Sequence, residues 1–366
     1  MAKLPAKTAK AIAIACIAAV AAAIVGGCSF NGQPRIRTGS YATTTLGTNF
    51  IDPNELGKHS YQTPFNEKNG IVYTCRGGHI DIAHVRIAAD DVRYLYYLTR
   101  KNLMAAAPEF TFKATEGPSR YYVHLKYPNY WQSLSRNDKK LIANEVSLEV
   151  SLYLSYTMMT WHEILTWFGY KSTGIFPEFP SAFSWEDNYS NIVGARLGVQ
   201  AVADQEHDFD EALTAALKQE LEYLGVQSAV TAQAAAEKMK GTWWEGTPFL
   251  VYVEMKERNM DIGLADGFIT PTLVPDVCKG ATPRSYPAPT LKAFLIYGFS
   301  MKLEVEPKEF EKAAILKIAY PDGKRKRIEP AIHLPQIMDY IKKQAIDMGY
   351  TVMPPKPPQQ KIPTPK

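Results

Sequence analysis

Residues 157–170 read TMMTWHEILTWFGY and end a long apolar stretch that begins near Leu141. From Leu141 to Trp167 almost every residue is apolar or small, so a helix here has no solvated stripe and is predicted to be the central helix of the fold. Glu163 interrupts this apolar surface. Because an isolated ionised carboxylate in an apolar environment costs several kcal/mol or more, Glu163 needs a partner elsewhere in the chain.

Around this helix the sequence predicts further helices and several strands. Helices are expected at about residues 81–102, 138–167, 184–203, 208–224, 228–240 and 334–348. EFTFKAT and RYYVHLKYP flank turn residues and predict a hairpin, and three later runs, LVYVEMK, AFLIYGFSMKLEVE and AAILKIAYPDGKRKRIEP, are typical of strands. The predicted fold class is α+β, with a mainly helical body and a small antiparallel β-sheet module towards the C-terminus.

Length and composition fit a folded protein, since the 366 residues are 46% hydrophobic and 21% charged. We expect a tether and irregular segment over residues 28–69, and a helical core domain with one hairpin over residues 70–245. An α+β module packed on the core would cover residues 246–350. Residues 351–366 are rich in proline and lysine and are expected to be extended and disordered.

The first 27 residues are typical of a bacterial signal peptide. Three lysines precede an alanine-rich apolar stretch at residues 11–25, which is short for a transmembrane helix. Small residues then lead directly to Cys28, a pattern that resembles the lipoprotein signal, in which this cysteine is lipidated and becomes the new first residue. The acyl chains would anchor the protein to a membrane through Cys28. An ordinary secretory signal with an incidental cysteine is the alternative.

The residue directly after Cys28 is Ser29 and not an aspartate. By resemblance to sorted lipoproteins, this implies a lipoprotein of the outer membrane that faces the periplasm. Removal of the three signal lysines would lower the formal net charge from +4 to +1. The mature chain therefore has no electrostatic footprint for nucleic acid.

Cys75 and Cys278 are the two cysteines left after processing and lipidation. An even pair in an oxidising periplasm suggests a disulfide. Two separately buried thiols, or a reactive Cys75, are the alternatives.

The segment HIDIAHVRIAADD offers possible partners for Glu163. Asp81 and His84 are three residues apart, so they share one face of the predicted helix. Imidazole and carboxylate groups suit zinc and similar divalent ions, and catalytic zinc uses three protein ligands plus water. The alternative is a buried His–Asp hydrogen-bond pair beside a helix cap.

His162 precedes Glu163 and could bind a metal together with ligands from the earlier helix. The HExxH motif of zinc proteases is absent because Thr166 stands where the second histidine is required. Glu163 would act as general base on a metal-bound water, or pair with Arg86. Glu149 falls close to the same helical line as Glu163 and is a further candidate for the lining of the site.

A third polar cluster lies in FPSAFSWEDNYSNIVG. Ser184 and Asp187 nearly match a capping box, and acidic residues suit the positive end of a helix. Asp187 is nevertheless a candidate metal ligand, and Glu186 and Asn191 are candidates for the lining of the same site. Gly194 and Gly198 would allow another helix to approach closely.

The blocks CRGGHIDIAHVRIAADD, TWHEILTWFGY and FPSAFSWEDNYSNIVG resemble those of an uncharacterised family of bacterial lipoproteins, a domain-of-unknown-function family. The resemblance covers about residues 70–200. It implies a secreted envelope protein and supplies no reaction. Where that family carries an aromatic residue this chain has His79, which argues against His79 as an essential ligand.

Three functional hypotheses follow. The first is a periplasm-facing, metal-dependent hydrolase of an envelope substrate, with zinc or another divalent metal on His84 and His162, Asp81 or Asp187 as a further ligand, and Glu163 as base. The second is a non-catalytic structural or binding lipoprotein. The third makes Cys75 the nucleophile of a thiol hydrolase or acyltransferase. The sequence names no protein partner and no substrate.

Overall fold

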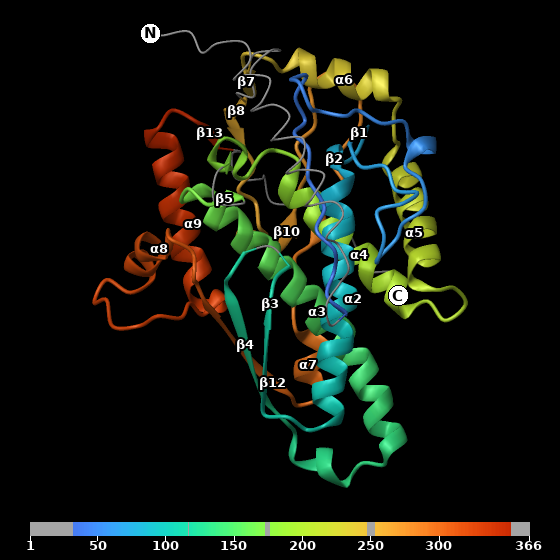
Figure 1. Ribbon diagram of the computed structural model, residues 1–366, viewed down its shortest axis with the longest axis vertical. Coiled ribbons are helices and arrows are strands. Elements are labelled where there is room, and N and C mark those ends of the chain that lie inside the picture. The colour runs from blue at the N-terminus through green and yellow to red at the C-terminus, as the bar shows by residue number, and fades with distance from the viewer. Residues whose placement is uncertain (1–31, 116, 173–175, 247–252, 353–366) are drawn as a thin grey trace, which may run out of the picture.

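The structure is a computed structural model that describes residues 32–115, 117–172, 176–246 and 253–352 (Figure 1). The expected signal peptide, Cys28 and the proline-rich tail after residue 352 lie outside these residues. None of the helices in the described ranges is both long enough and apolar enough to cross a membrane.

Three helices form the centre of the molecule: α2 (Ile82–Met104), α3 (Arg136–Trp167) and α4 (Asp187–Ala203). They pack on one another, and Figure 1 shows α3 running through the middle of the fold. The central position predicted for the apolar helix is therefore correct. Two glycines let α4 approach α2, because a Cβ on Gly194 would lie 2.2 Å from the carbonyl oxygen of Val85 and one on Gly198 would lie 2.8 Å from Cα of Ala89.

The largest sheet joins distant parts of the chain. The predicted hairpin is present as β3 (Glu109–Lys113) and β4 (Arg120–Lys126), and β12 (Ser300–Glu306) pairs with β4 to give the order β12-β4-β3. Both pairings are antiparallel, and the inward residues alternate along each strand as expected for a half-buried sheet. The boundary expected near residue 245 is thus crossed by a hydrogen-bonded ladder, visible in Figure 1 as an orange strand beside two green ones.

The other strands form small two-stranded sheets. Four of these are antiparallel: β1 (Ile71–Thr74) with β2 (Gly78–Asp81), β5 (Lys171–Ser172) with β6 (Phe176–Pro177), β7 (Trp244–Gly246) with β8 (Val253–Met255), and β10 (Phe268–Ile269) with β11 (Tyr286–Pro287). A short parallel pair joins β9 (Glu257–Arg258) to β13 (Thr351–Val352). A helical body with small, mostly antiparallel sheets confirms the α+β class.

The remaining helices are α5 (Phe209–Leu224), α6 (Ala229–Lys238), α7 (Lys292–Ile296), α8 (Lys312–Ala319) and α9 (Pro330–Asp347). Two of them correct the prediction, because AAILKIA forms helix α8 and AFLI lies in helix α7 where strands were expected. A short apolar run does not distinguish a buried strand from a buried helix by its pattern. In α8, Ile315 and Ala319 are buried four residues apart, which is helical spacing.

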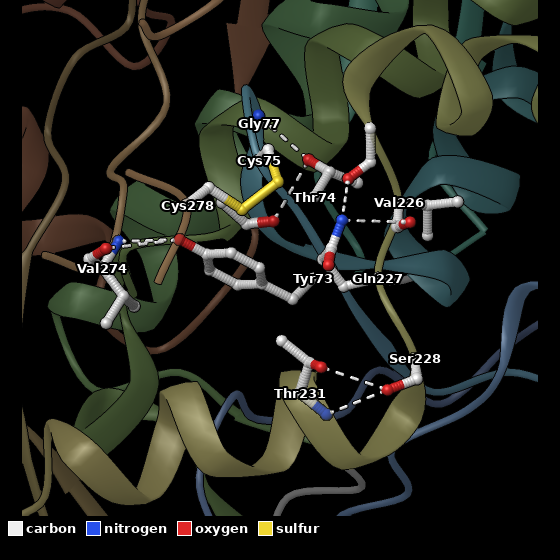
Figure 2. The surroundings of a disulfide bond; sticks show 12 residues. Tyr73, Thr74, Cys75, Gly77, Val226, Gln227, Ser228, Thr231, Val274 and Cys278 are labelled. Carbon is white, nitrogen blue, oxygen red and sulfur yellow. Dashed lines mark hydrogen bonds between the residues drawn. A yellow bond between two sulfur atoms is a disulfide. The ribbon is translucent and has the colours of Figure 1, made fainter. Parts of the chain in front are cut away.

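Cys75 and Cys278 form a disulfide with their Cα atoms 5.3 Å apart (Figure 2). Cys75 directly follows β1. Tyr73, two residues earlier, is hydrogen-bonded to two other segments of the chain. Its backbone carbonyl accepts a hydrogen bond from the backbone N–H of Gln227 at 2.8 Å, and its hydroxyl accepts one from the backbone N–H of Val274 at 3.1 Å. In this oxidised form Cys75 has no free thiol.

Candidate active site

The site begins where strand β2 turns into helix α2. Asp81 is the N-cap of α2, and its Oδ1 accepts a hydrogen bond from the backbone N–H of Ala83 at 2.7 Å. Its Oδ2 accepts one from the backbone N–H of Ser40 at 2.7 Å. The carboxyl is fully buried, and this burial raises its pKa above the ordinary value even though His84 and the two donors act in the opposite sense.

One turn into α2, His84 meets the first residue of α4. Nδ1 of His84 lies 3.2 Å from Oδ1 of Asp187. The other oxygen of Asp187 accepts hydrogen bonds from the backbone N–H and the hydroxyl of Ser184, at 3.1 and 2.9 Å. Asp187 is therefore held by Ser184 through one oxygen, and its other oxygen faces the imidazole.

Several carboxyl groups surround His84. Burial lowers the pKa of His84, but Asp187, and less strongly Asp81 and Glu163, raise it, so that the net pKa lies well above the usual value. The side chain still keeps 19% of its exposure. His84 is thus a protonatable group that is partly open and electrostatically tied to three acids.

Glu163 comes to this group from helix α3. Its Oε2 accepts a hydrogen bond from the backbone N–H of Phe183 at 2.7 Å, and the residue is only 3% exposed. Burial, and then the charge of Asp187, raise the pKa of Glu163 to about 7. Phe183 has a φ of 54°, a left-handed conformation that is uncommon for a bulky residue and that is typical of strained functional positions.

Glu186 adds a fourth buried carboxyl group. Its Oε1 accepts a hydrogen bond from the backbone N–H of Ala42 at 3.1 Å, and its Oε2 has no hydrogen-bond partner in the described part of the chain. Burial, followed by the charge of Asp187, raises the pKa of Glu186 to about 8. Glu186 is therefore mostly protonated at neutral pH.

The segment of residues 39–42, here called the strap, lies over this cluster. A Cβ added to Gly39 would lie 2.8 Å from Nε2 of His84 and 3.1 Å from Oδ2 of Asp81. The strap also supplies the donors of Ser40 and Ala42 described above. The sequence predicts a tether for these residues and does not identify them as part of the site. Backbone N–H donors, and a close approach that requires glycine, leave no distinct pattern in the sequence.

A cavity of about 50 Å³ opens beside His84, and His162 lies on its wall as well. The other walls are mainly apolar and include Ile87, Tyr121, Met158, Met159, Trp161 and Leu165. Glu163 and Asp187 are not among the lining residues. Of the residues that the sequence analysis assigned to the proposed metal site and its base, His84 and His162 line this cavity, whereas Glu163 and Asp187 act on His84 through their charges.

His162 approaches the cavity from α3 and faces a different acid. Its Nε2 lies 3.4 Å from Oε2 of Glu178, and its ring meets that of Tyr170 edge-on, with the ring centroids 5.7 Å apart. The side chain of His162 is 25% exposed. His162 and Glu163 are neighbours in sequence but point about 100° apart around the helix, which explains why only one of them lines the cavity.

The other site residues expected from the sequence are Glu149, Arg86 and Asn191. The first two bind other parts of the chain. Glu149 accepts hydrogen bonds from the backbone N–H groups of Ala293 and Phe294, at 3.0 and 2.8 Å, and so caps helix α7. Arg86 donates to the backbone carbonyls of Lys68 and Leu56. Asn191 lies one helical turn after Asp187, is fully buried, and has no partner for its amide within the described residues.

Arg86 belongs to a second buried charge network that the sequence did not reveal. Arg37 contacts Asp90 at 2.6 Å and Glu67 at 3.0 Å, and His59 bridges the same two acids at 2.9 and 3.2 Å. Burial raises the pKa of Glu67, but hydrogen bonds and charges from His59 and Arg37 lower it by more. The net pKa of Glu67 therefore lies well below the usual range. This network attaches the segment before β1 to helix α2 and so holds the strap in place.

His79, next to the site in sequence, has a different environment. It is buried with one ring nitrogen 3.0 Å from the carbonyl oxygen of Ala232, and burial lowers its pKa to about 4. Its other nitrogen accepts from the indole N–H of Trp185 at 3.3 Å. His79 is therefore a neutral packing residue.

Within the ranges that the structure describes, no group of three or more His, Cys, Asp or Glu side chains is placed to hold a metal ion together. His84 uses Nδ1 for Asp187, and His162 has Glu178 beside it. The arrangement at hand is a His–Asp pair with buried acids, which suits proton transfer.

A family described as "Protein of unknown function (DUF4056)" matches residues 27–250. This range contains all three polar blocks and ends before β8. No curated protein and no solved structure matches the chain.

Proposed function

The chain belongs to the DUF4056 family of proteins of unknown function, and we propose that it is a hydrolase of the bacterial cell envelope, anchored by lipid at Cys28 and facing the periplasm. The observation that carries the hydrolase proposal is the His84–Asp187 pair, which is held between two helix starts beside a cavity. Buried titratable groups with strongly shifted pKa values and a specific charge partner are typical of catalytic sites.

His84 is the proton-transfer group in this proposal because it lies on the cavity wall, has Asp187 3.2 Å from its Nδ1, and has its pKa raised by several acids. In its neutral form it accepts a proton from a water molecule that attacks the substrate. The resulting imidazolium, held by Asp187, then donates that proton to the leaving group. Asp187 fixes the orientation and tautomer of the ring, as an orienting carboxylate does in other acid–base sites.

Glu163 takes a different role from the general base expected from the sequence. It binds the backbone N–H of Phe183 and does not line the cavity, so we assign it a positioning and charge-setting role behind His84. With a pKa of about 7 it changes charge in the physiological range. The state of Glu163 therefore adjusts the proton affinity of His84.

The experiment compares His84→Gln with a matched control, His207→Gln. His207 also pairs with an aspartate, Asp204, at 3.1 Å, but this pair lies on the surface. Hydrolysis of p-nitrophenyl acetate by the purified protein is expected to lose about two to four orders of magnitude in kcat/KM in His84→Gln, and to be unchanged in His207→Gln. Equal activity of the two variants would leave the non-catalytic structural or binding role as the better account.

A zinc-dependent form of the hydrolase stays a prediction. His84 and His162 both line the cavity, which is the observation in its favour, and the catalytic metal would polarise the attacked bond or the attacking water. Elemental analysis of the purified protein tests it. Stoichiometric zinc that is lost in both His84→Ala and His162→Ala would support this form, and metal-free protein with full activity would reject it.

The envelope location is supported by the disulfide, because such bridges persist in oxidising compartments and are rare in the cytosol. It also agrees with the signal-like sequence before Cys28. Fractionation of cells that express the wild type and Cys28→Ala tests the anchor. The wild type should be found with the outer membrane, whereas the variant should be released in soluble form or remain unprocessed.

A further inference from the structure

The cavity beside His84 limits what can react there, and this limit deepens the function proposed above, on which it rests. In the proposed reaction the group that exchanges a proton with His84 occupies this space, because His84 lies on the cavity wall. The size, lining and charge of the cavity therefore describe the reacting part of the substrate.

Size is the first restriction. The cavity measures about 50 Å³, whereas an engineered cavity of about 150 Å³ in another protein holds a benzene molecule. A space of this size accepts a methyl or ethyl group together with a carbonyl. It does not accept a fatty-acyl chain or a sugar ring.

Lining is the second restriction. Met158, Met159 and Leu165 give apolar contact, and three of the polar lining residues, Ser119, Trp161 and Glu309, are bound to one another. Ser119 donates its hydroxyl to Glu309 at 2.8 Å and accepts the indole N–H of Trp161 at 3.0 Å. The wall thus offers mainly dispersion contacts to a ligand, which favours a small apolar group.

Charge is the third restriction. Asp81, Asp187 and Glu163 all act on His84, and Arg35, the cation on the cavity wall, is paired with Glu67. The cavity wall itself carries the acids Asp91 and Glu309, so a phosphate or sulfate group would meet carboxyl groups there and would find Arg35 already paired. A neutral carbonyl group avoids this repulsion.

We propose that the substrate carries a short acyl group, of acetyl to propionyl size, in ester or amide linkage to a larger envelope molecule that stays outside the cavity. Water attacks the acyl carbon, and its proton passes to His84 as the new C–O bond forms. The bond from the acyl carbon to the leaving oxygen or nitrogen then breaks, and the leaving atom takes the proton from His84. The products are a short carboxylic acid and the free hydroxyl or amine.

The test is a series of p-nitrophenyl esters of increasing chain length: acetate, butyrate and octanoate. One extra methylene in a fitted apolar pocket changes kcat/KM by about tenfold or more. The wild type should therefore prefer acetate over octanoate by at least about that factor. Met158→Ala removes side-chain volume from the cavity wall and should raise the octanoate-to-acetate ratio about tenfold or more.

Met338→Ala is the matched control, because Met338 is a fully buried methionine in α9 that does not line the cavity. It should leave the ratio unchanged while showing the stability cost of the same substitution. If hydrolysis depends on His84 but favours octanoate, or if Met158→Ala leaves the ratio unchanged, the short-acyl inference is overturned and the hydrolase proposal stands. If no ester is hydrolysed more quickly by the wild type than by His84→Gln, both are overturned.

Discussion

Nδ1 of His84 lies 3.2 Å from Oδ1 of Asp187, and this contact joins the start of helix α2 to the start of helix α4. Helix starts carry partial positive charge, which favours nearby carboxylates. Asp81 and Asp187 each occupy such a start, so the two helices collect negative charge at the place where the histidine sits. The charge of Asp187 therefore raises the pKa of His84 against the positive potential of the two helix starts.

Asp187→Asn is expected to shift the pH dependence of hydrolysis. The neutral form of His84 is the base, so the wild-type rate should rise with pH as His84 loses its proton. The charge of Asp187 contributes most to raising the pKa of His84. Its removal lowers that pKa and moves the rising limb to lower pH, while the maximal rate falls because the ring is less well oriented. A pH–rate profile measures both effects, and an unmoved limb would contradict the role given to His84.

Gly39→Ala is expected to reduce activity by displacing the strap or the imidazole. The added Cβ would lie 2.8 Å from Nε2 of His84, closer than carbon and nitrogen atoms pack. Ser40→Ala is the control, since the bond from Ser40 to Asp81 comes from the backbone and is kept. Steady-state kinetics and thermal unfolding of both variants separate loss of the site from loss of the fold. A Gly39→Ala variant with normal kcat/KM would show that the strap is not part of the site.

Glu163→Gln is expected to stabilise the protein at alkaline pH. The folded-state pKa of Glu163 is raised to about 7 from an ordinary value of 4.5, so folding favours its protonated form. The wild type therefore loses stability as pH rises through this window, on the order of 3 kcal/mol by pH 8. Glutamine resembles the neutral carboxyl and avoids this loss. Denaturant unfolding at pH 4.5 and pH 8 should show equal stabilities at the lower pH and a more stable variant at the higher one.

Gly194→Ala is expected to destabilise the fold strongly. The new Cβ would meet the backbone of Val85 at 2.2 to 2.7 Å, and backbone atoms cannot rotate away as a side chain can. Overpacking of a core costs typically about 1–3 kcal/mol and sometimes more. Gln200→Ala, an exposed position on the same helix, controls for the change in helix propensity. A Gly194→Ala variant with the melting temperature of the wild type would mean that α2 and α4 separate easily.

Reduction of the disulfide is expected to lower the free energy of unfolding. Cys75 and Cys278 are 203 residues apart in sequence, and closing a loop of this length restricts the unfolded chain by about 2–5 kcal/mol. Urea unfolding with and without dithiothreitol measures the difference. The double variant Cys75→Ser/Cys278→Ser should match the reduced wild type and be insensitive to the reductant. A reductant effect on that variant would point to a cause other than this bridge.

The sequence was informative about the fold where long patterns exist. The mainly apolar stretch from Leu141 to Trp167 predicted a central helix, and most residues of α3 from Ala143 onward are buried. The prediction was wrong where the pattern was short. AAILKIA fits both a buried strand and a buried helix, and it forms helix α8 because of the packing around Ile315.

The candidate site was predictable to the extent that it depends on helical spacing. The blocks around His84, Glu163 and Asp187 lie together in the structure, and the need of buried acids for partners was the signal that pointed to them. Glu149 shares the helical line of Glu163, yet the line runs along the helix and a rise of 1.5 Å per residue separates the two by about 21 Å. The strap escaped notice because its contribution comes from backbone N–H groups, which every sequence contains.

The bridge between Cys75 and Cys278 has one more consequence for a protein exposed to proteases. A single cut in the chain anywhere between these two cysteines yields fragments that stay covalently joined. A nicked molecule would therefore migrate as one species on a non-reducing denaturing gel and as separate fragments on a reducing one. After such a cut, the C-terminal fragment is lost only when the disulfide is also reduced.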